Sequence, residues 1–298
     1  TQPVVQVQDV SGNLVPTATG TVTASLVGAT LTGTNTATIT NGVATFTDLG
    51  AYGTIGAKTL NFEATGVAAV SQSLTLAHGA AYQLAVAAPS TNVNDVALTT
   101  QPVVTIQDQD GNTVTTTSQA GQTVTLSSSD ATIGGTLSMA ATAGVANFTG
   151  KGIKLTGLVG PRNLRATITS PGTITGNATV NITFGAATQL SLKTPAVGFV
   201  NRQAFGTQPV IEVQDVSGNL VANAAISIQV TASAGNGATL GGTTTMTTVN
   251  GIGDFATNAS GLKLSGTVGQ YVLTFAKVGG GLTTDAQTVN LVPAAADH

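Results

Sequence analysis

The pattern that recurs along this chain is a short run of β-branched residues followed at once by a polar turn. Its first copy is Thr1-Gln-Pro-Val-Val-Gln-Val-Gln-Asp-Val-Ser-Gly-Asn-Leu-Val15. Val4 and Val7 suit a half-buried strand. The following Asp-x-x-Gly-Asn segment favours a tight turn, because Asp accepts hydrogen bonds from nearby backbone N–H groups and Gly adopts positive φ. The stretch therefore predicts a strand, a turn and the start of a second strand.

The pattern occurs twice more, as Thr100-Gln-Pro-Val-Val-Thr-Ile-Gln-Asp-Gln-Asp-Gly-Asn-Thr-Val114 and Thr207-Gln-Pro-Val-Ile-Glu-Val-Gln-Asp-Val-Ser-Gly-Asn-Leu-Val221. The copies start at residues 1, 100 and 207, which puts them 99 and 107 residues apart. Such a spacing is the size of one small β-domain. The length of 298 residues alone suggests two domains, but the repeat indicates three.

A second set of motifs follows each copy. The Phe that ends a Gly-x-x-x-Phe segment lies on the apolar side of the alternation, which predicts a core position for Phe46, Phe148 and Phe255. Next comes a Gly-x-x-Gly turn at 53–56, 157–160 and 266–269. A strand follows each turn, at 58–64, 162–168 and 271–276, and its Leu is a further core candidate: Leu60, Leu164 and Leu273.

Each full repeat holds about seven short strands separated by turn signals, and nothing resembles an amphipathic helix. The predicted fold class is all-β, with three tandem immunoglobulin-like β-sandwich domains, the first lacking its N-terminal strand. The Cys–Trp–Cys set of antibody domains is absent. The predicted domains are residues 1–79, 80–185 and 186–293, and residues 294–298 are the start of a following strand or a linker.

The first repeat lacks the strand that opens the other two, Ala81-Tyr-Gln-Leu-Ala-Val86 and Ala187-Thr-Gln-Leu-Ser-Leu192. Two explanations are open at this stage. The favoured one is that the sequence is a window on a longer tandem array. The other is that the first domain has an open edge that accepts a strand from a neighbouring molecule, since an unpaired edge is a template for strand addition.

Composition narrows the class of partner. Charged residues make up 7% of the chain, against roughly 25% in an average soluble domain. Thr and Ser take the outward strand positions instead, which is typical of bacterial and archaeal surface proteins. The net charge is −3 and no basic cluster is present, which argues against nucleic acid as a partner. No apolar run is long enough for a membrane span. The absence of Cys excludes disulfides and thiolate metal sites.

One segment has the oxygen spacing of a calcium loop. Asp108, Asp110 and Asn112 stand at alternate positions, and carboxylate and amide oxygens are ligands that Ca²⁺ accepts. The downstream bidentate Glu of an EF-hand is missing, and the first and third copies have Ser11 and Ser217 in place of Asp110. A plain turn is therefore the favoured interpretation, with a calcium site as the alternative and no other cofactor expected.

Candidates for catalysis and modification are few. The two His residues, His78 and His298, do not form a catalytic constellation with any motif of the sequence, so we expect no enzyme activity. Alternating Thr residues from Thr32 to Thr40 line one face of a predicted strand, most simply a solvent face. Four triplets match the acceptor sequence for N-linked glycans, which makes glycans possible surface partners: those starting at Asn147, Asn177, Asn181 and Asn258.

The Thr-Gln-Pro-Val-Val-x-Val-Gln-Asp-x-x-Gly-Asn motif, with Gly-Val-Ala-x-Phe some way downstream, resembles the bacterial immunoglobulin-like tandem repeats of large cell-surface proteins, in the style of invasin and intimin repeats. The resemblance covers all three repeats. It implies an extracellular, cell-surface structural role in a prokaryote, as a stalk or as a subunit of a surface layer, sheath or filament. It carries no catalytic residues to this chain.

The junctions between repeats are short, at 77–80 and 184–187, which predicts a rod rather than loosely linked beads. The partners expected for such a rod are neighbouring copies of the same chain, joined by strand complementation or by short contacts between domains. The alternative function is a receptor- or glycan-binding adhesin. That function predicts an aromatic-rich loop cluster that does not repeat, for which Tyr52 and the segment from Phe199 to Phe205 are the candidates.

Overall fold

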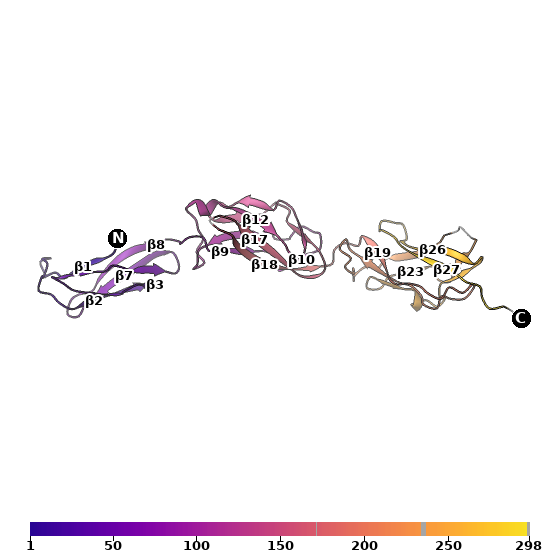
Figure 1. The fold of residues 1–298 in the computed structure, drawn as a ribbon, viewed down its shortest axis with the longest axis horizontal. Coiled ribbons are helices and arrows are strands. Elements are labelled where there is room, and N and C mark those ends of the chain that lie inside the picture. The colour runs from indigo at the N-terminus through magenta and orange to yellow at the C-terminus, as the bar shows by residue number, and fades with distance from the viewer. Residues whose placement is uncertain (171, 234–236, 297–298) are drawn as a thin grey trace.

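The computed structural model describes residues 1–170, 172–233 and 237–296. Within these ranges the chain is all-β: 27 short strands and two turns of 3₁₀-helix. The strands pair in three consecutive groups, which we call unit 1, unit 2 and unit 3. Figure 1 shows the three units following one another in a row, with unit 1 in indigo and violet at one end and unit 3 in orange and yellow at the other.

Each unit is made of small sheets, and no strand pairs with a strand of another unit within the described ranges. Unit 1 comprises β1 (Val4–Gln6), β2 (Thr21–Val27), β3 (Thr30–Thr32), β4 (Thr36–Thr38), β5 (Val43–Thr45), β6 (Gly50–Tyr52), β7 (Gly56–Glu63) and β8 (Val70–Leu76). Unit 2 comprises β9 (Gln83–Ala87), β10 (Thr91–Val93), β11 (Val103–Gln107), η1 (Ser118–Gly121), β12 (Thr123–Ser127), β13 (Thr132–Gly134), β14 (Ser138–Ala140), β15 (Val145–Asn147), β16 (Lys154–Thr156), β17 (Gly160–Ile168) and β18 (Ile174–Thr183). Unit 3 comprises β19 (Gln189–Thr194), β20 (Val210–Gln214), β21 (Ser227–Ala232), β22 (Thr239–Gly241), β23 (Thr245–Thr247), β24 (Ile252–Asp254), η2 (Phe255–Thr257), β25 (Lys263–Ser265), β26 (Gly269–Lys277) and β27 (Asp285–Leu291).

The sheet order repeats from unit to unit. The larger sheet runs β4-β2-β7-β8 in unit 1, β10-β18-β17-β12-β14 in unit 2 and β23-β21-β26-β27 in unit 3. The smaller sheet is built around the strand of the first motif, as β1-β5, β15-β11-β9 and β19-β20-β24. All described strand pairs are antiparallel apart from β10 with β18. Small antiparallel sheets in this arrangement are consistent with tandem β-sandwiches.

Each unit has a hydrophobic core of its own, and the core positions predicted from the motifs are confirmed. Phe148, Phe255, Leu164 and Leu273 are fully buried, while Phe46 and Leu60 are 2% and 5% exposed. The alternation explains this, because a strand that pairs within a sheet turns every second side chain inward. In each motif the Pro before the strand accepts a hydrogen bond from the N–H of the core Phe, at 2.9 to 3.1 Å: Pro3 from Phe46, Pro102 from Phe148 and Pro209 from Phe255.

Unit 1 has the smallest core. Eight buried residues form it, against eighteen in unit 2 and sixteen in unit 3 among the described residues. The cause is a missing neighbour: β11 pairs with β9 on its second side and β20 with β19, but β1 pairs with β5 alone. Val5 and Val7 are consequently only half-buried, whereas their counterparts are fully buried: Val104 and Ile106 in unit 2, and Ile211 and Val213 in unit 3.

Two expectations change or stay open at this level. The Thr residues from Thr32 to Thr40 are exposed as expected, but they do not line one strand. Thr32 lies on β3, which pairs with β6, whereas Thr36 and Thr38 lie on β4, which pairs with β2 in a different sheet, because the chain turns between the two strands at Thr34. The predicted domain limits at 79, 185 and 293 lie in gaps between strands and stay a prediction.

Candidate functional site

The Asp-x-x-Gly-Asn turn has one conformation in all three units. In unit 2, Asp108 Oδ1 accepts hydrogen bonds from the backbone N–H groups of Asp110 (3.0 Å) and Asn112 (2.8 Å). Gly111 has φ +82°, a conformation that strongly favours glycine. The same bonds recur around Asp9 and Asp215, and the glycines Gly12 and Gly218 have φ values of +82° and +81°. The turn is thus a preformed piece whose outer atoms are available to a neighbour.

In unit 2 this turn docks onto the Gly-x-x-Gly turn of unit 1. The side chain of Asn112 bonds both ways across the junction: its Nδ2 donates to the Gly53 carbonyl (2.9 Å) and its Oδ1 accepts from the Ile55 N–H (3.1 Å). Asp110 Oδ2 accepts from the Gly53 N–H (3.0 Å). We call this set of contacts joint 1. It connects the two motifs that the sequence repeats most faithfully.

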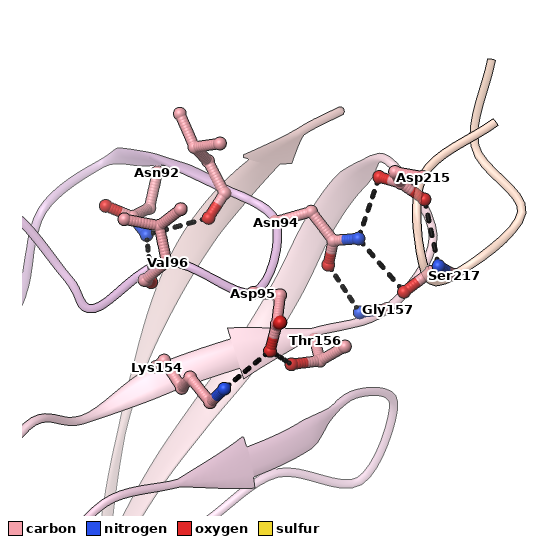
Figure 2. Close-up of polar contacts among 10 residues, drawn as sticks. Asn92, Asn94, Asp95, Val96, Lys154, Thr156, Gly157, Asp215 and Ser217 are labelled. Carbon is pink, nitrogen blue, oxygen red and sulfur yellow. Dashed lines mark hydrogen bonds and ion pairs between the residues drawn. The ribbon is translucent and has the colours of Figure 1, made fainter. Parts of the chain in front are cut away.

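Joint 2 repeats the arrangement between units 2 and 3. Asn219 Nδ2 donates to the Gly157 carbonyl (2.9 Å), and Asn219 Oδ1 accepts from the Val159 N–H (2.8 Å). The Gly157 N–H goes to Asn94 Oδ1 (2.9 Å), a residue of unit 2 itself. In Figure 2, Asn94 lies between Gly157 on one side and the turn of unit 3 on the other. The two joints therefore share the Asn–turn bonds and differ in what caps the first glycine.

At joint 2, Asn94 accepts the hydrogen bond from the first glycine, as Asp110 does at joint 1. Its Nδ2 donates to Asp215 Oδ2 (2.8 Å) and to Ser217 Oγ (3.0 Å), so the Ser of the third motif is paired with an Asn of the preceding unit. At joint 1 no counterpart of Asn94 exists in the described part of unit 1, and the Asp of the second motif bonds directly to the glycine.

The loop that carries Asn94 is itself anchored. Asp95 accepts hydrogen bonds on Oδ1 from Lys154 Nζ (2.6 Å) and from Thr156 Oγ1 (2.9 Å), both on β16 (Figure 2). These contacts hold the pKa of Asp95 below its ordinary value, and the bond from Lys154 is the largest cause. Asn94 is therefore presented to unit 3 by a loop fixed to its own sheet.

Each turn also binds the linker that leads into its own unit. Asp108 Oδ2 accepts from the Gly79 N–H (2.9 Å), and Asp215 Oδ2 accepts from the Gly185 N–H (2.8 Å). At joint 1 the ring of His78 adds a contact between Nε2 and Thr116 Oγ1 (2.9 Å). The linkers are thus held to the following unit by the carboxylate that organises the turn.

Burial and hydrogen bonding act against each other on these two carboxylates. Asp108 is 4% exposed and Asp215 is fully buried. Burial raises the pKa of each, and it is the largest single effect, but the hydrogen bonds from the turn and the linker together outweigh it. The pKa of Asp108 and the pKa of Asp215 therefore both lie below the ordinary aspartate value, so both groups are ionised at neutral pH.

The three residues of the calcium hypothesis do come together at joint 1. Their oxygens are bonded to protein donors: Asp108 to its turn and linker, Asp110 to Gly53, and Asn112 to Ile55. Among the described residues no group of three or more His, Cys, Asp or Glu side chains could hold a metal ion. The alternately spaced oxygens of Asp110 and Asn112 thus help to join units 1 and 2. Calcium binding at this position stays an untested alternative.

The joints could not be read from single motifs. The sequence showed that both motifs recur, and it assigned turns to both, but their bonding partners lie 57 to 62 residues away in the preceding unit. The one available signal was that both turns recur in every copy, with the Asp, Gly and Asn of the first turn and the two glycines of the second unchanged.

Unit 1 carries a groove where the other units have an extra strand. The groove has a volume of about 620 Å³ and lies between β1 and the β8 edge of the larger sheet. Val5, Val7, Phe62 and Val70 contribute its apolar lining. In units 2 and 3 the side chains of Leu84 and Leu190, from β9 and β19, are buried in the matching cores. The groove therefore has the position and character of a strand site.

The aromatic candidates divide into two groups. Phe205 is 4% exposed and packs edge-to-face on Phe199, with ring centroids 4.9 Å apart, inside the core of unit 3. That segment is therefore not an aromatic binding loop, because its two rings pack against each other in the core of unit 3. Tyr52 and Tyr82 are 51% and 61% exposed and line a cleft of about 340 Å³ at joint 1. The counterparts of these two tyrosines at joint 2 are Thr156 and Thr188.

Two further surface properties bear on partners. Asn147, Asn177 and Asn181 are exposed, but Nδ2 of Asn258, the atom to which a glycan would attach, is buried. No helix within the described ranges is long and apolar enough to cross a membrane.

Comparison of the sequence with protein-family models and with curated proteins found no match. Solved structures with a similar arrangement include the bacterial integrin-binding protein invasin (15% identity, TM-score 0.32) and the Escherichia coli adhesin FdeC (15% identity, TM-score 0.34). Both alignments cover 97% of this chain, with 56% of the invasin chain and 91% of the FdeC chain.

Domains 4–9 of the surface layer protein SbsC (16% identity, TM-score 0.25) align over 97% of this chain and 42% of that chain. A β-glycosidase from Bacteroides vulgatus aligns over 70% of this chain at 14% identity and a TM-score of 0.29, and this chain spans only 24% of its length. Because the identities and TM-scores are this low, the similarities identify neither a family nor an activity for this chain.

Proposed function

We propose that this chain is a rigid, non-enzymatic module of three tandem immunoglobulin-like sandwiches, serving as a stalk or as a subunit of an extracellular surface assembly. The observation that carries the proposal is the pair of joints. The same turn docks onto the same turn at both junctions, and six side chains provide the bonds: Asn94, Asp110, Asn112, Asp215, Ser217 and Asn219.

The hydrogen bonds of a joint act mainly to fix the orientation of two adjacent units and not to bring the units together. Adjacent units are tethered covalently, so a joint does not have to supply the free energy of association. It has only to favour one orientation, and hydrogen bonds are directional enough to do so. Interfaces between domains of one chain otherwise allow relative motion by default. A repeated polar clamp together with a bonded linker therefore suits a spacer whose length and direction matter.

The immunoglobulin-like assignment and the cell-surface location belong to the same proposal. Small sheets around one core in each unit, with mostly antiparallel pairing and no α-helix within the described ranges, support the first. The low content of charged residues and the Thr-rich exposed strand positions support the second. Surface patches of so little charge also favour contact with neighbouring copies or glycans over free solution.

We further propose that unit 1 is completed by a strand added to β1. The register places Val70 of β8 where unit 2 has Gly176 and unit 3 has Asp285. Over Gly176, β9 approaches so closely that an added Cβ would lie 2.2 Å from the Leu84 carbonyl oxygen. Over Asp285, β19 leaves room for a side chain, whose Oδ2 accepts from the Leu192 N–H (2.7 Å). The strand that fits unit 1 should therefore resemble β19.

The rod is tested on single molecules. The chain has no Cys, so two dye sites can be placed on units 2 and 3 by substituting exposed residues with Cys. Asn219→Ala removes both Asn bonds of joint 2, and we expect it to broaden the distribution of energy-transfer efficiencies between the dyes. Asn13→Ala is the matched control, because it alters the same motif in unit 1, where no joint is formed. Equal, narrow distributions for both variants would contradict the proposal.

Strand addition is tested with a peptide of residues 186–195, which spans β19. We expect this peptide to bind the full chain and to raise the temperature at which unit 1 unfolds, because the groove supplies both an unpaired strand edge and an apolar slot. A peptide with Leu190→Asp should not bind, since a charge would enter the slot. The proposal fails if both peptides bind equally or neither changes the unfolding of unit 1.

A second candidate function, glycan binding, is favoured by the cleft at joint 1. Tyr52 and Tyr82 present two exposed rings beside Asp110, and this combination does not recur at joint 2. Exposed Tyr rings offer rigid, partly apolar contact area to a ligand. An array of glycans probed with the full chain tests it, with Tyr52→Ala as the variant that should lose any signal. An array without hits, or hits unaffected by the substitution, would count against this function.

A further inference from the structure

Both halves of a joint are present again in units 1 and 3, where they have no docked partner among the described residues. The turn Asp9–Asn13 of unit 1 has the same internal hydrogen bonds as the docked turns, yet it is fully exposed. Asn13 Oδ1 has no partner among the described residues, although the matching atoms of Asn112 and Asn219 each accept a backbone N–H. The turn of unit 1 is thus built like an inserting half.

The Gly-x-x-Gly turn of unit 3 is built like a receiving half. Gly266 donates its N–H to Asn201 Oδ1 (3.0 Å), as Gly157 donates to Asn94. Val268 corresponds to Val159, is 47% exposed, and its N–H has no partner in the described part of the chain. This turn therefore offers the N–H that an incoming Asn would bond.

Asn94 and Asn201 occupy equivalent positions in units 2 and 3. The turn beside Asn94 has a docked neighbour, and the turn beside Asn201 has none among the described residues. Asn94, in a filled joint, donates its Nδ2 to Asp215 and Ser217 of the next unit. Asn201, in an unfilled one, donates its Nδ2 to its own Gly266 carbonyl (2.9 Å). That carbonyl is the counterpart of the Gly157 oxygen that Asn219 binds. Docking would require only that the Asn201 amide turns from the glycine carbonyl to the incoming turn.

The two outer halves match each other in type. Joint 1 combines Asp110 with a unit in which no Asn94 counterpart is described, and joint 2 combines Ser217 with Asn94. The outer inserting half carries Ser11 and the outer receiving half carries Asn201, which is the combination of joint 2. We propose that the turn Asp9–Asn13 of one copy of this chain docks onto the turn 266–269 of a second copy, forming a third joint of the second type.

Such a joint is weak by itself, because few hydrogen bonds and a small contact area place it with transient interfaces. It sets the repeat and direction of an assembly: copies follow one another head to tail along the line of the row. The inference rests on the proposed structural function, because only a stiff row of units would keep successive copies aligned in one direction. It is nevertheless independent in its test, which measures contacts between molecules.

The experiment mixes two populations of the full chain. One carries a spin label at Val10→Cys, a fully exposed position whose counterpart Val216 stays exposed within joint 2, so that a label there does not block docking. The other is ¹⁵N-labelled and carries no spin label. We expect concentration-dependent broadening of the amide signals of Val268 and Gly269, together with a shift of the Asn201 side-chain amide.

Variants separate docking from chance encounters. Asn13→Ala in the spin-labelled copy should weaken the association roughly fivefold or more, as for a central interface residue. Ser11→Ala, whose side chain makes no described contact within unit 1, should weaken it less while leaving the fold unchanged. Asn177→Ala, the same chemical change at an exposed position of β18 in unit 2, is the control and should have no effect.

Two results would overturn the proposal. One is the absence of broadening at Val268 and Gly269 at millimolar concentration, which would leave these turns to other units of a longer array. The other is broadening spread over the whole surface and insensitive to Asn13→Ala. Neither result would affect the single-molecule test of the rod, so the two failures can be told apart.

Discussion

At the scale of single residues, Asp215 shows how much one carboxylate connects. Its Oδ1 accepts from the N–H groups of Ser217 and Asn219 within the turn. Its Oδ2 accepts from the linker at Gly185 and from Asn94 of the preceding unit. One side chain therefore closes the turn, fixes the linker and bonds the neighbouring unit, and it does so without any contact to solvent.

Replacing this side chain should be costly. Asp215→Ala leaves the buried Gly185 N–H without an acceptor and leaves the Asn94 amide with Ser217 Oγ alone, and we expect the free energy of unfolding to fall by roughly 2–4 kcal/mol. Asp9→Ala removes the same residue type from the exposed turn of unit 1, and we expect a distinctly smaller loss. Chemical denaturation of both variants measures the difference. Equal losses would show that the turn alone, and not the joint, accounts for the effect.

The pKa of Asp215 and that of Asp108 give the joints a pH dependence with a definite sign. A carboxyl whose pKa is lower in the folded than in the unfolded state stabilises the fold above the unfolded pKa of about 3.9. That stabilisation is lost as the pH falls through the folded pKa. We therefore expect both joints to keep their stability from neutral pH down to about pH 4 and to lose it below.

Small-angle scattering across this pH range checks the prediction through the maximum dimension of the chain. Below pH 4 the chain should bend more before its units unfold, as judged by circular dichroism of the same samples. Asp215→Asn, which does not titrate, should flatten the dependence at joint 2. A joint that loosens on raising the pH instead would contradict the assigned direction of the pKa shifts.

At the scale of elements, the strand that opens a unit decides how complete its core is. β9 crosses β18 at Gly176, where a Cβ would lie 2.2 Å from the Leu84 carbonyl oxygen and 2.8 Å from its Cβ. Because the nearest atom is backbone, it cannot move aside alone. The absence of a side chain at Gly176 therefore allows β9 to pack closely on the larger sheet of unit 2. This close packing sets how deeply Leu84 is buried in the core.

Gly176→Ala should push β9 away from β18 and destabilise unit 2 by roughly 1–3 kcal/mol, as overpacking in a core does. Gly121→Ala is the matched control, since no atom lies within 4 Å of an added Cβ there and its φ is not positive. Thermal unfolding of both variants measures the effect. If Gly176→Ala were as stable as the control, the close approach of β9 would not be what holds it.

At the scale of the whole molecule, three similar units are connected in one direction. Each joint presents the Asp-x-x-Gly-Asn turn of the following unit to the Gly-x-x-Gly turn of the preceding one. A row built this way has two different ends (Figure 1). Its direction follows from the order of the motifs in the sequence, and any extension by further units or copies must keep that direction.

Most of what is local in this fold could be predicted from the sequence. The strands of the first motif, the positive φ at Gly12, Gly111 and Gly218, and the burial of the repeated Phe and Leu positions follow from alternation and turn chemistry. Such features depend on residues a few positions apart, so one copy of the motif suffices to infer them. The absence of an opening strand in unit 1 was likewise visible by comparing the repeats.

What only the tertiary structure decided are the contacts between repeats. Asn112 and Asn219 look like ordinary turn residues, and their partners in the preceding unit are 57 to 62 residues away in the chain. The alternate oxygens of Asp108, Asp110 and Asn112 suggested a cation, whereas the fold brings backbone N–H groups of a linker and of a neighbouring unit to them. The sequence determined the shape of each turn because that shape is local; which turns meet is set by the packing of whole units end to end.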